Sequence, residues 1–343
     1  MKIFITGGTG FIGQHTLRRL AQTDHQVVCL VRPGSEPKLL NSRLMRPWPN
    51  LQIVNGDVTD PAALAAGMQG CDALIHLANL YSMWLQETSE FERVNVTGTR
   101  NVMTAAADAG LKKVVYVSTV AVYGQPAERV FTEESARGPR QFSHYGRTKT
   151  EGERIAWELH RTRGLPLTAL YPGIVLGAGD DKPSGVYIHD FIAGRIPTPI
   201  FRRSVETYVH VNDTAEAVLQ ALERPKTVGQ KYLIGNTRLN GMDYARLICQ
   251  AAGVKMPWMR LPDVIVMAAA YLLTWQAQLF THQPPPWGLS IDAAWTLLHG
   301  FAYDGSKAER ELGLRYTPVL EALKDAVAWY RGEFKLQAPN PKS

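Results

Sequence analysis

The chain has 343 residues, of which 45% are hydrophobic and 20% charged, and its net charge is +6. This is the composition of a globular protein with ample apolar material for a core, in one large or two closely joined domains. The basic residues are scattered, which excludes a nucleic-acid-binding stripe and leaves only a mild attraction for anionic ligands.

Three cysteines, Cys29, Cys71 and Cys249, stand far apart, with neither a disulfide pattern nor a metal-ligand spacing. Such usage is typical of a reducing compartment. The sequence begins with an expected strand and shows no signal-peptide pattern. We therefore expect a cytoplasmic protein with no metal site, no nucleic-acid partner and a small-molecule substrate.

Short apolar runs alternate with helix-length segments along the first half of the chain. The runs typical of buried strands are 2–6, 26–31, 51–56, 73–78, 113–119 and 167–172. This alternation predicts an α/β fold with a parallel sheet covered on both faces. After Pro172 the pattern breaks into a loop-rich stretch, 173–207. Residues 207–223 then resemble a return to the sheet, and 237–343 is mostly helical.

The most apolar stretch, residues 264–275, reads VIVMAAAYLLTW. It is shorter than the ~20 residues that a helix needs to span a bilayer, so we expect no stable membrane span. Two interpretations stay open. One is a buried helix of the substrate-binding region, which we favour, and the other is an anchor on a membrane surface.

A glycine-rich segment, TGGTGFIG, follows the first strand and opens the first helix. The spacing of Gly7, Gly10 and Gly13 lets the chain reverse and lets a pyrophosphate approach the helix N-terminus. Free N–H groups and the helix dipole favour an anion there. The residues of this segment that we expect at a dinucleotide are Gly7, Thr9, Gly10, Phe11, Ile12 and Gly13.

The end of the second strand indicates which dinucleotide is bound. An acidic residue here would hydrogen-bond the ribose of NAD, but the sequence has Arg32, with Ser35 and Lys38 nearby. An arginine suits a 2′-phosphate, so NADP is favoured over NAD, unless Arg32 merely ends the strand in solvent. Asp57 and Val58, after the third strand, are placed to contact adenine; a simple turn aspartate is the alternative.

Hydroxyl residues and a lysine follow the fifth strand. Ser118 and Thr119 end that strand, and Tyr145 and Lys149 lie one helical turn apart. Free tyrosine has a pKa of about 10, and a nearby ammonium and a charged nicotinamide would lower it toward neutral pH. Together with the phosphate-binding turn, this set predicts proton transfer by Tyr145 coupled to hydride transfer.

The ordered motifs resemble the extended short-chain dehydrogenase/reductase family, within the NAD-dependent epimerase/dehydratase superfamily. They are TGGTGFIG (6–13), Asp57, HLAN (76–79), Asn95, VSTVAVYG (117–124), YGRTK (145–149), YPGIVLG (171–177) and YVHVND (208–213). The resemblance covers nearly the whole chain. It implies a Rossmann-type NAD(P)-binding domain over 1–172, rejoined by 208–236. A smaller, mostly α-helical substrate-binding region would comprise 173–207 and 237–343.

The resemblance also implies roles for individual residues. Thr119, rather than Ser118, would be the active-site hydroxyl, Tyr145 the general acid/base, and Lys149 would also hold the nicotinamide ribose. Further cofactor contacts would come from Leu77, Ala78, Asn79, Asn95, Pro172, Gly173, Ile174 and Val175. Asn95 could equally be purely structural. The family makes a homodimer plausible.

Two branches of the family compete. Enzymes of nucleotide sugars usually carry a pyrophosphate-binding arginine where this chain has Glu206, which would repel a diphosphate, although Arg202 and Arg203 stand just upstream. Residues 257–276 and 301–330 instead resemble bacterial dihydroflavonol-4-reductase-like and hopanoid-associated proteins, whose substrates are often bulky and apolar.

Aromatic residues beyond the fourth strand and in the loop-rich stretch fit the apolar interpretation. We expect Tyr81, Trp84 and Tyr187, together with Thr119, at a substrate pocket, with ordinary core packing as the alternative for Trp84 and Tyr187. The sequence therefore predicts an NADP-dependent oxidoreductase of a mainly apolar, possibly aromatic or polycyclic carbonyl compound. The alternatives are a nucleotide-sugar epimerase or dehydratase with tightly bound NAD, and a non-catalytic NADP sensor.

Overall fold

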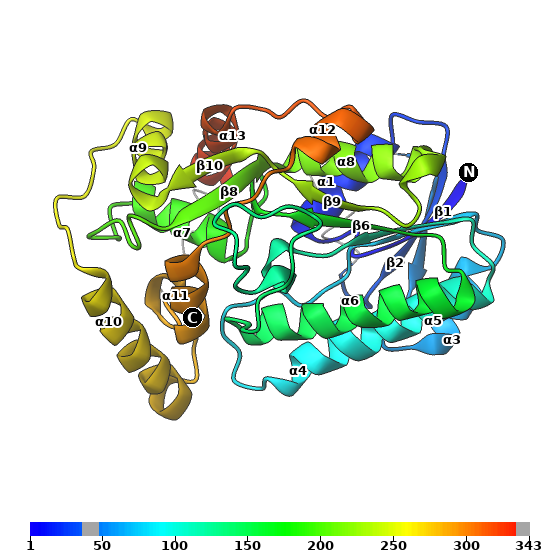
Figure 1. The fold of residues 1–343 in the computed structure, drawn as a ribbon, viewed down its shortest axis with the longest axis horizontal. Helices are drawn as coiled ribbons and strands as arrows, with labels where there is room; N and C mark the ends of the chain where they lie inside the picture. The colour runs from blue at the N-terminus through cyan, green and yellow to red at the C-terminus, as the bar shows by residue number, and fades with distance from the viewer. Residues whose placement is uncertain (36–47, 334–343) are drawn as a thin grey trace.

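A computed structural model describes residues 1–35 and 48–333 (Figure 1). Its centre is a seven-stranded sheet in the order β3-β2-β1-β4-β5-β6-β9. The strands are β1 (Lys2–Thr6), β2 (Gln26–Val31), β3 (Leu51–Asn55), β4 (Ala73–His76), β5 (Lys113–Val117), β6 (Leu167–Pro172) and β9 (Lys231–Ile234). All neighbours pair in parallel. The parallel sheet predicted from the apolar runs is confirmed, and so is the Rossmann-type fold that the resemblance implied.

Helices cover both faces of this sheet. On β1, Ile3 and Ile5 join a core with α1 (Phe11–Leu20), α8 (Val211–Glu223) and α12 (Ser306–Leu312). Phe4, which points the other way, joins a second core with α3 (Pro61–Met68), α5 (Thr99–Asp108) and α6 (His144–Arg163). Figure 1 shows the two helix layers above and below the sheet.

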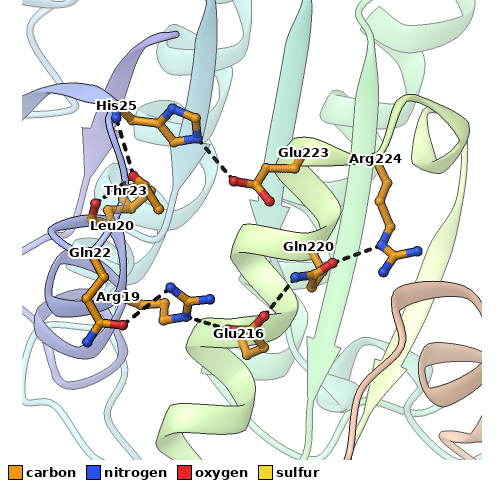
Figure 2. Close-up of polar contacts among 9 residues, drawn as sticks. All are labelled: Arg19, Leu20, Gln22, Thr23, His25, Glu216, Gln220, Glu223 and Arg224. Carbon is orange, nitrogen blue, oxygen red and sulfur yellow. Dashed lines mark hydrogen bonds and ion pairs between the residues drawn. The ribbon is translucent and has the colours of Figure 1, made fainter.

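Polar contacts join α1 and α8 at the outer surface (Figure 2). Arg19 Nε lies 2.6 Å from Glu216 Oε2, and His25 Nε2 lies 3.3 Å from Glu223 Oε1. Gln220 donates to Glu216 at 2.8 Å and accepts from Arg224 at 2.9 Å. These contacts hold α8, a late segment of the chain, against the first helix.

A small second sheet has the order β10-β8-β7. Its strands are β7 (Ile174–Leu176), β8 (Val205–His210) and β10 (Thr237–Asn240), and α7 (Pro183–Ile192), α9 (Gly241–Ala252) and α13 (Val319–Glu333) pack around it. We expected 208–236 to rejoin the large sheet. In the structure β8 pairs with β7 and β10 instead. The strand β7 follows β6 almost directly along the chain, and it leaves the large sheet and pairs with β8. The chain returns to the large sheet with α8 and β9.

The remaining elements are short or lie at the substrate end. They are α4 (Ser89–Phe91), η1 (Glu92–Gly98), η2 (Val120–Tyr123), η3 (Pro225–Thr227), α10 (Asp263–Gln276), η4 (Ala277–Thr281), η5 (Pro286–Gly288) and α11 (Ile291–His299). The expectation of a buried apolar helix over 264–275 is wrong. Of α10 only Val266 and Ala270 are buried, because α11 covers a single stripe of it.

Candidate active site

A cavity of about 1080 Å³ runs along the carboxyl ends of the large sheet's strands and continues beside the small sheet. This is the edge at which open α/β sheets bind ligands. The predicted residues that line it are Gly7, Thr9, Gly10, Phe11, Ile12, Gly13, Arg32, Asp57, Val58, Leu77, Ala78, Asn79, Tyr81, Thr119, Tyr145, Pro172, Gly173, Ile174, Val175 and Tyr187. The structure therefore gathers residues from strand ends, loops and helix starts that are far apart in the sequence into one continuous site.

The turn between β1 and α1 leaves no room for side chains. Gly7 has a φ of +78°, and a Cβ there would lie 2.5 Å from the backbone N of Ala78. A Cβ on Gly13 would lie 2.0 Å from the carbonyl O of Gly7. Gly10 caps α1 without a side chain, so the first N–H groups of the helix face the cavity rather than a capping oxygen. This cradle fits a dinucleotide pyrophosphate.

The outer end of the cavity carries mixed charge. Arg32 is exposed and lines the wall with Ser35, while Lys38 lies outside the described residues. Asp57 accepts hydrogen bonds from the Thr59 amide at 2.9 Å and from the Thr59 hydroxyl at 2.7 Å. Burial opposes its ionisation, but these bonds and the charges of Arg93 and Arg32 outweigh burial and lower the pKa of Asp57. Asp57 thus both shapes a turn and faces the cavity.

The reactive centre is built from the end of β5 and the start of α6. Ser143 caps α6 by accepting the Gly146 amide at 3.0 Å, which fixes Tyr145 in the first turn. The ring of Tyr145 lies 4.8 Å from that of Tyr81. Burial raises the pKa of Tyr145 above its usual value, and a hydrogen bond with Thr119 acts in the opposite direction. Tyr145 is therefore a neutral phenol next to the Thr119 hydroxyl.

Lys149 lies beneath this centre and, unlike Tyr145, is not on the cavity wall among the residues described. Its Nζ donates to the Val117 carbonyl at 3.2 Å and lies 4.6 Å from the Tyr116 ring centroid. Burial lowers the pKa of Lys149 to about 7, against a smaller opposing effect of Glu153. Burial is the dominant effect on the Tyr145 pKa in the protein alone, and a lowering of that pKa by Lys149 together with a charged nicotinamide stays a prediction.

Two buried polar residues organise the elements behind the site. Asn95 accepts the Leu80 amide at 2.7 Å and donates to the Leu80 carbonyl and the Thr148 hydroxyl, each at 3.1 Å. It lies behind the cavity wall and ties the loop after β4 to α6. Glu153, which the sequence analysis missed, accepts hydrogen bonds from Ser118, Arg137, Trp157 and Tyr171. The only signal for Glu153 in the sequence was its place on the inward side of α6, one turn after Lys149.

Aromatic and aliphatic side chains surround the substrate end of the cavity. Besides Tyr81 and Tyr187, the larger ones are Met83, Phe201, Tyr208, Tyr244, Trp287, Phe301 and Trp329. Trp84 is not on the described wall of the cavity, where its neighbour Met83 stands instead. The Trp84 backbone bonds with the Ser82 hydroxyl, which turns this loop and carries the indole away from the cavity.

Besides Asp180, whose pKa burial raises to about 6, Glu206 is an acidic side chain buried on the described cavity wall. It accepts the Phe301 amide at 2.9 Å, and burial raises its pKa from 4.5 to about 8. The residue is thus largely uncharged at neutral pH, so the expectation that Glu206 repels a diphosphate through its charge is wrong. Arg202 and Arg203 line a different cleft, beside the start of α10.

In Glu206→Gln the free energy of unfolding should depend less on pH than in the wild type. A carboxyl whose pKa is raised by folding stabilises the protein fully below the unfolded value of 4.5, and that contribution is lost as the pH rises through about 8. Relative to the variant, the wild type should lose on the order of 3 kcal/mol of stability between pH 5 and pH 9. Urea unfolding of both proteins over this range measures the difference, and parallel curves would contradict it.

Comparison with known proteins places this site in a family. The model described as NAD dependent epimerase/dehydratase family matches residues 3–235. A Synechocystis sp. protein named "Putative dihydroflavonol 4-reductase" is 30% identical over 340 residues, covering 96% of this chain and 94% of the relative.

Two other matches show the breadth of the family. The 4-hydroxy-2-methyl-3-oxo-4-farnesyl-3,4-dihydroquinoline-1-oxide ketoreductase of Stigmatella aurantiaca is 28% identical, covering 95% of this chain and 96% of its own. The crystal structure of DesIV, a dTDP-glucose 4,6-dehydratase from Streptomyces venezuelae with NAD and TYD bound, has a TM-score of 0.77 and 25% identity, covering 98% of both chains. The fold, the glycine cradle and the match to residues 3–235 agree: the chain belongs to the NAD dependent epimerase/dehydratase family.

Proposed function

We propose that the protein is an NADP-dependent reductase of a carbonyl group on a mainly apolar, aromatic or polycyclic substrate. The observation that carries the proposal is the substrate end of the cavity. Its wall is mainly aromatic and aliphatic, its Glu206 carboxyl is largely uncharged, and Arg202 and Arg203 line another cleft. The ketoreductase from Stigmatella aurantiaca, named for a farnesylated quinoline oxide, supports a substrate of this class.

The cofactor would lie along the carboxyl ends of the strands. The Gly7–Gly13 cradle would hold the pyrophosphate, Arg32 a 2′-phosphate, and residues 172–175 the nicotinamide end, with Lys149 orienting its ribose. When bound, NADPH supplies hydride-transfer chemistry. Thr119 would hold the substrate oxygen by a hydrogen bond, and Tyr145 would give its phenolic proton to that oxygen.

A cofactor and substrate survey tests the proposal. Nucleotide released from the denatured protein is identified, and consumption of NADPH and NADH is followed with a panel of apolar ketones. Weakly retained nucleotide and NADPH consumption with aromatic or polycyclic ketones are expected. Tightly retained NAD without any ketone-dependent turnover would contradict the proposal.

Arg32→Asp should reverse the cofactor preference. The variant loses a charge-assisted bond to the 2′-phosphate and gains an acceptor for ribose hydroxyls, so the ratio of NADPH to NADH affinity should fall about 10–100-fold. Fluorescence titration with both cofactors measures the ratio. Arg18→Asp, at an exposed position of α1, is the matched control, and an unchanged ratio in Arg32→Asp would show that the phosphate is recognised elsewhere.

The second candidate function is that of a nucleotide-sugar epimerase or dehydratase with tightly bound NAD, which the likeness to DesIV favours. A ligand that binds only the folded state raises the melting temperature. We expect thymidine or uridine diphosphate at millimolar concentration to leave the melting temperature unchanged, because the cavity's described wall offers no arginine at the substrate end. A rise of several degrees would favour the sugar-nucleotide reaction instead.

A further inference from the structure

A stripe of exposed apolar side chains runs along α10 and η4. Its members are Val264, Tyr271, Leu272, Trp275, Leu279 and Phe280. Val264, Tyr271, Trp275 and Leu279 follow one another at seven, four and four positions, which places them on one side of the helix, and Leu272 and Phe280 widen this face. After Asp263 the segment to Thr281 has no charged residue, and by length and composition alone Asp263–Thr281 is a candidate membrane helix. An apolar patch of this kind on a folded surface indicates an interaction site.

The opposite side of α10 is fixed to the protein. Val266 and Ala270 are buried with Ala294 of α11. The Thr274 hydroxyl accepts the Ile291 amide at 2.9 Å. In Figure 1 the two helices pack side by side at the edge of the molecule, away from the large sheet. A helix held on one side by its own fold cannot be surrounded by lipid, so this geometry suits a helix that lies on a surface rather than one that crosses it.

Positive charge gathers where the stripe begins. The cleft at the start of α10 is lined by Arg129, Arg202, Arg203 and Arg246 together with Asp243 and Asp263. Arg246 is paired with Asp243 at 2.6 Å. Exposed Lys255 and Arg260 lie in the segment that leads into α10. Cationic side chains therefore outnumber carboxylates at this end of the stripe. Such a positively charged surface attracts anionic lipid head groups.

The other end of the stripe reaches the mouth of the cavity. Residues 282–290 follow η4 directly, and within them Trp287 is exposed and also lines the cavity with Leu289. Trp258, before α10, and Trp275, within it, are exposed as well. Tryptophan prefers the interface between lipid and water, where its ring is buried and its N–H stays hydrated.

We propose that the α10–η4 stripe docks this protein on the surface of a bilayer that contains anionic lipid. The apolar side chains enter the head-group boundary, and the arginines at the start of α10 contact the lipid phosphates. The cavity mouth at Trp287 then faces the bilayer, so that an apolar substrate passes to the site without crossing water; this last step rests on the proposed function. A second copy of the chain is a less suitable partner. A two-fold contact uses the same surface on both copies, so it would bring the excess positive charge of one copy against that of the other.

Sedimentation with vesicles tests the docking without any measurement of turnover. The full chain is mixed with vesicles of phosphatidylcholine and phosphatidylglycerol (7:3) or of phosphatidylcholine alone. We expect binding to the mixed vesicles that weakens as salt is added. Leu272→Asp and Phe280→Asp, at side chains 62% and 65% exposed, should each weaken it at least about tenfold. Val228→Asp, at an exposed valine just after η3, is the matched control and should bind like the wild type.

Three results would overturn the proposal. The first is no sedimentation of the wild type with mixed vesicles, and the second is equal binding of all variants. The third is conversion of a dimer into a monomer by Leu272→Asp in vesicle-free light scattering, which would assign the face to a second copy. Reduction of water-soluble ketones without vesicles reports on the proposed function separately, so failure of one proposal does not imply failure of the other.

Discussion

Replacing Tyr145 with phenylalanine is expected to lower turnover about 10²–10⁴-fold, the usual contribution of a positioned general acid. The substitution removes the phenolic proton and the contact with Thr119 but keeps the ring that packs against Tyr81. The residues expected to hold most of the dinucleotide lie elsewhere along the cavity, in the glycine cradle and beside Pro172. NADPH affinity should therefore change by no more than about fivefold, since one hydrogen bond is worth about 1 kcal/mol or less here.

The measurement is kcat with an apolar ketone, together with a fluorescence titration of NADPH. Tyr232→Phe is the matched control, because it also removes a buried tyrosine hydroxyl, which bonds Glu311 at 2.8 Å, at a position outside the cavity. The control should keep its turnover. If Tyr145→Phe lost NADPH affinity and turnover to the same extent, the residue would be part of the binding site and not the acid.

The sequence was informative where local chemistry decides the structure. The apolar runs of β1, β2, β4, β5 and β6 are buried on both faces, so their pattern alone indicates a parallel sheet. The cradle was predictable because a turn that excludes Cβ atoms requires glycine at Gly7 and Gly13. Most of the residues predicted to contact the cofactor follow from these two features, since they stand at or just beyond the end of one such strand.

Long-range packing decided what the sequence did not reveal. The apolar stretch of α10 has the composition of a core helix, and only the position of α11 leaves its outer face exposed. The sequence analysis treated Glu206 as a negative charge, but burial by the surrounding residues raises its pKa. The sequence also did not reveal that the Nζ of Lys149 bonds the Val117 carbonyl, on a strand distant in sequence.

Glu153 is a further residue whose role depends on distant partners, and Glu153→Ala is expected to cost the largest loss of stability. Its carboxylate is completely buried and accepts from Trp157 Nε1 at 3.1 Å, Tyr171 Oη at 2.7 Å and Ser118 Oγ at 3.1 Å. It also pairs with Arg137. Removing one partner of a buried ion pair leaves the other groups unsatisfied, which typically costs about 3–5 kcal/mol.

The consequence should extend from stability to catalysis. Ser118 precedes Thr119 at the end of β5, and Tyr171 precedes Pro172 at the end of β6, so Glu153 holds together the two strand ends that border the reactive centre. Thermal and urea unfolding should show the loss in Glu153→Ala, with lower kcat in the fraction that folds. Glu158→Ala, on the exposed side of the same helix beside Arg154, is the control and should lose less than about 1 kcal/mol. A Glu153 variant as stable as this control would mean that the buried cluster contributes no net stability, and that the strand ends are positioned by backbone pairing alone.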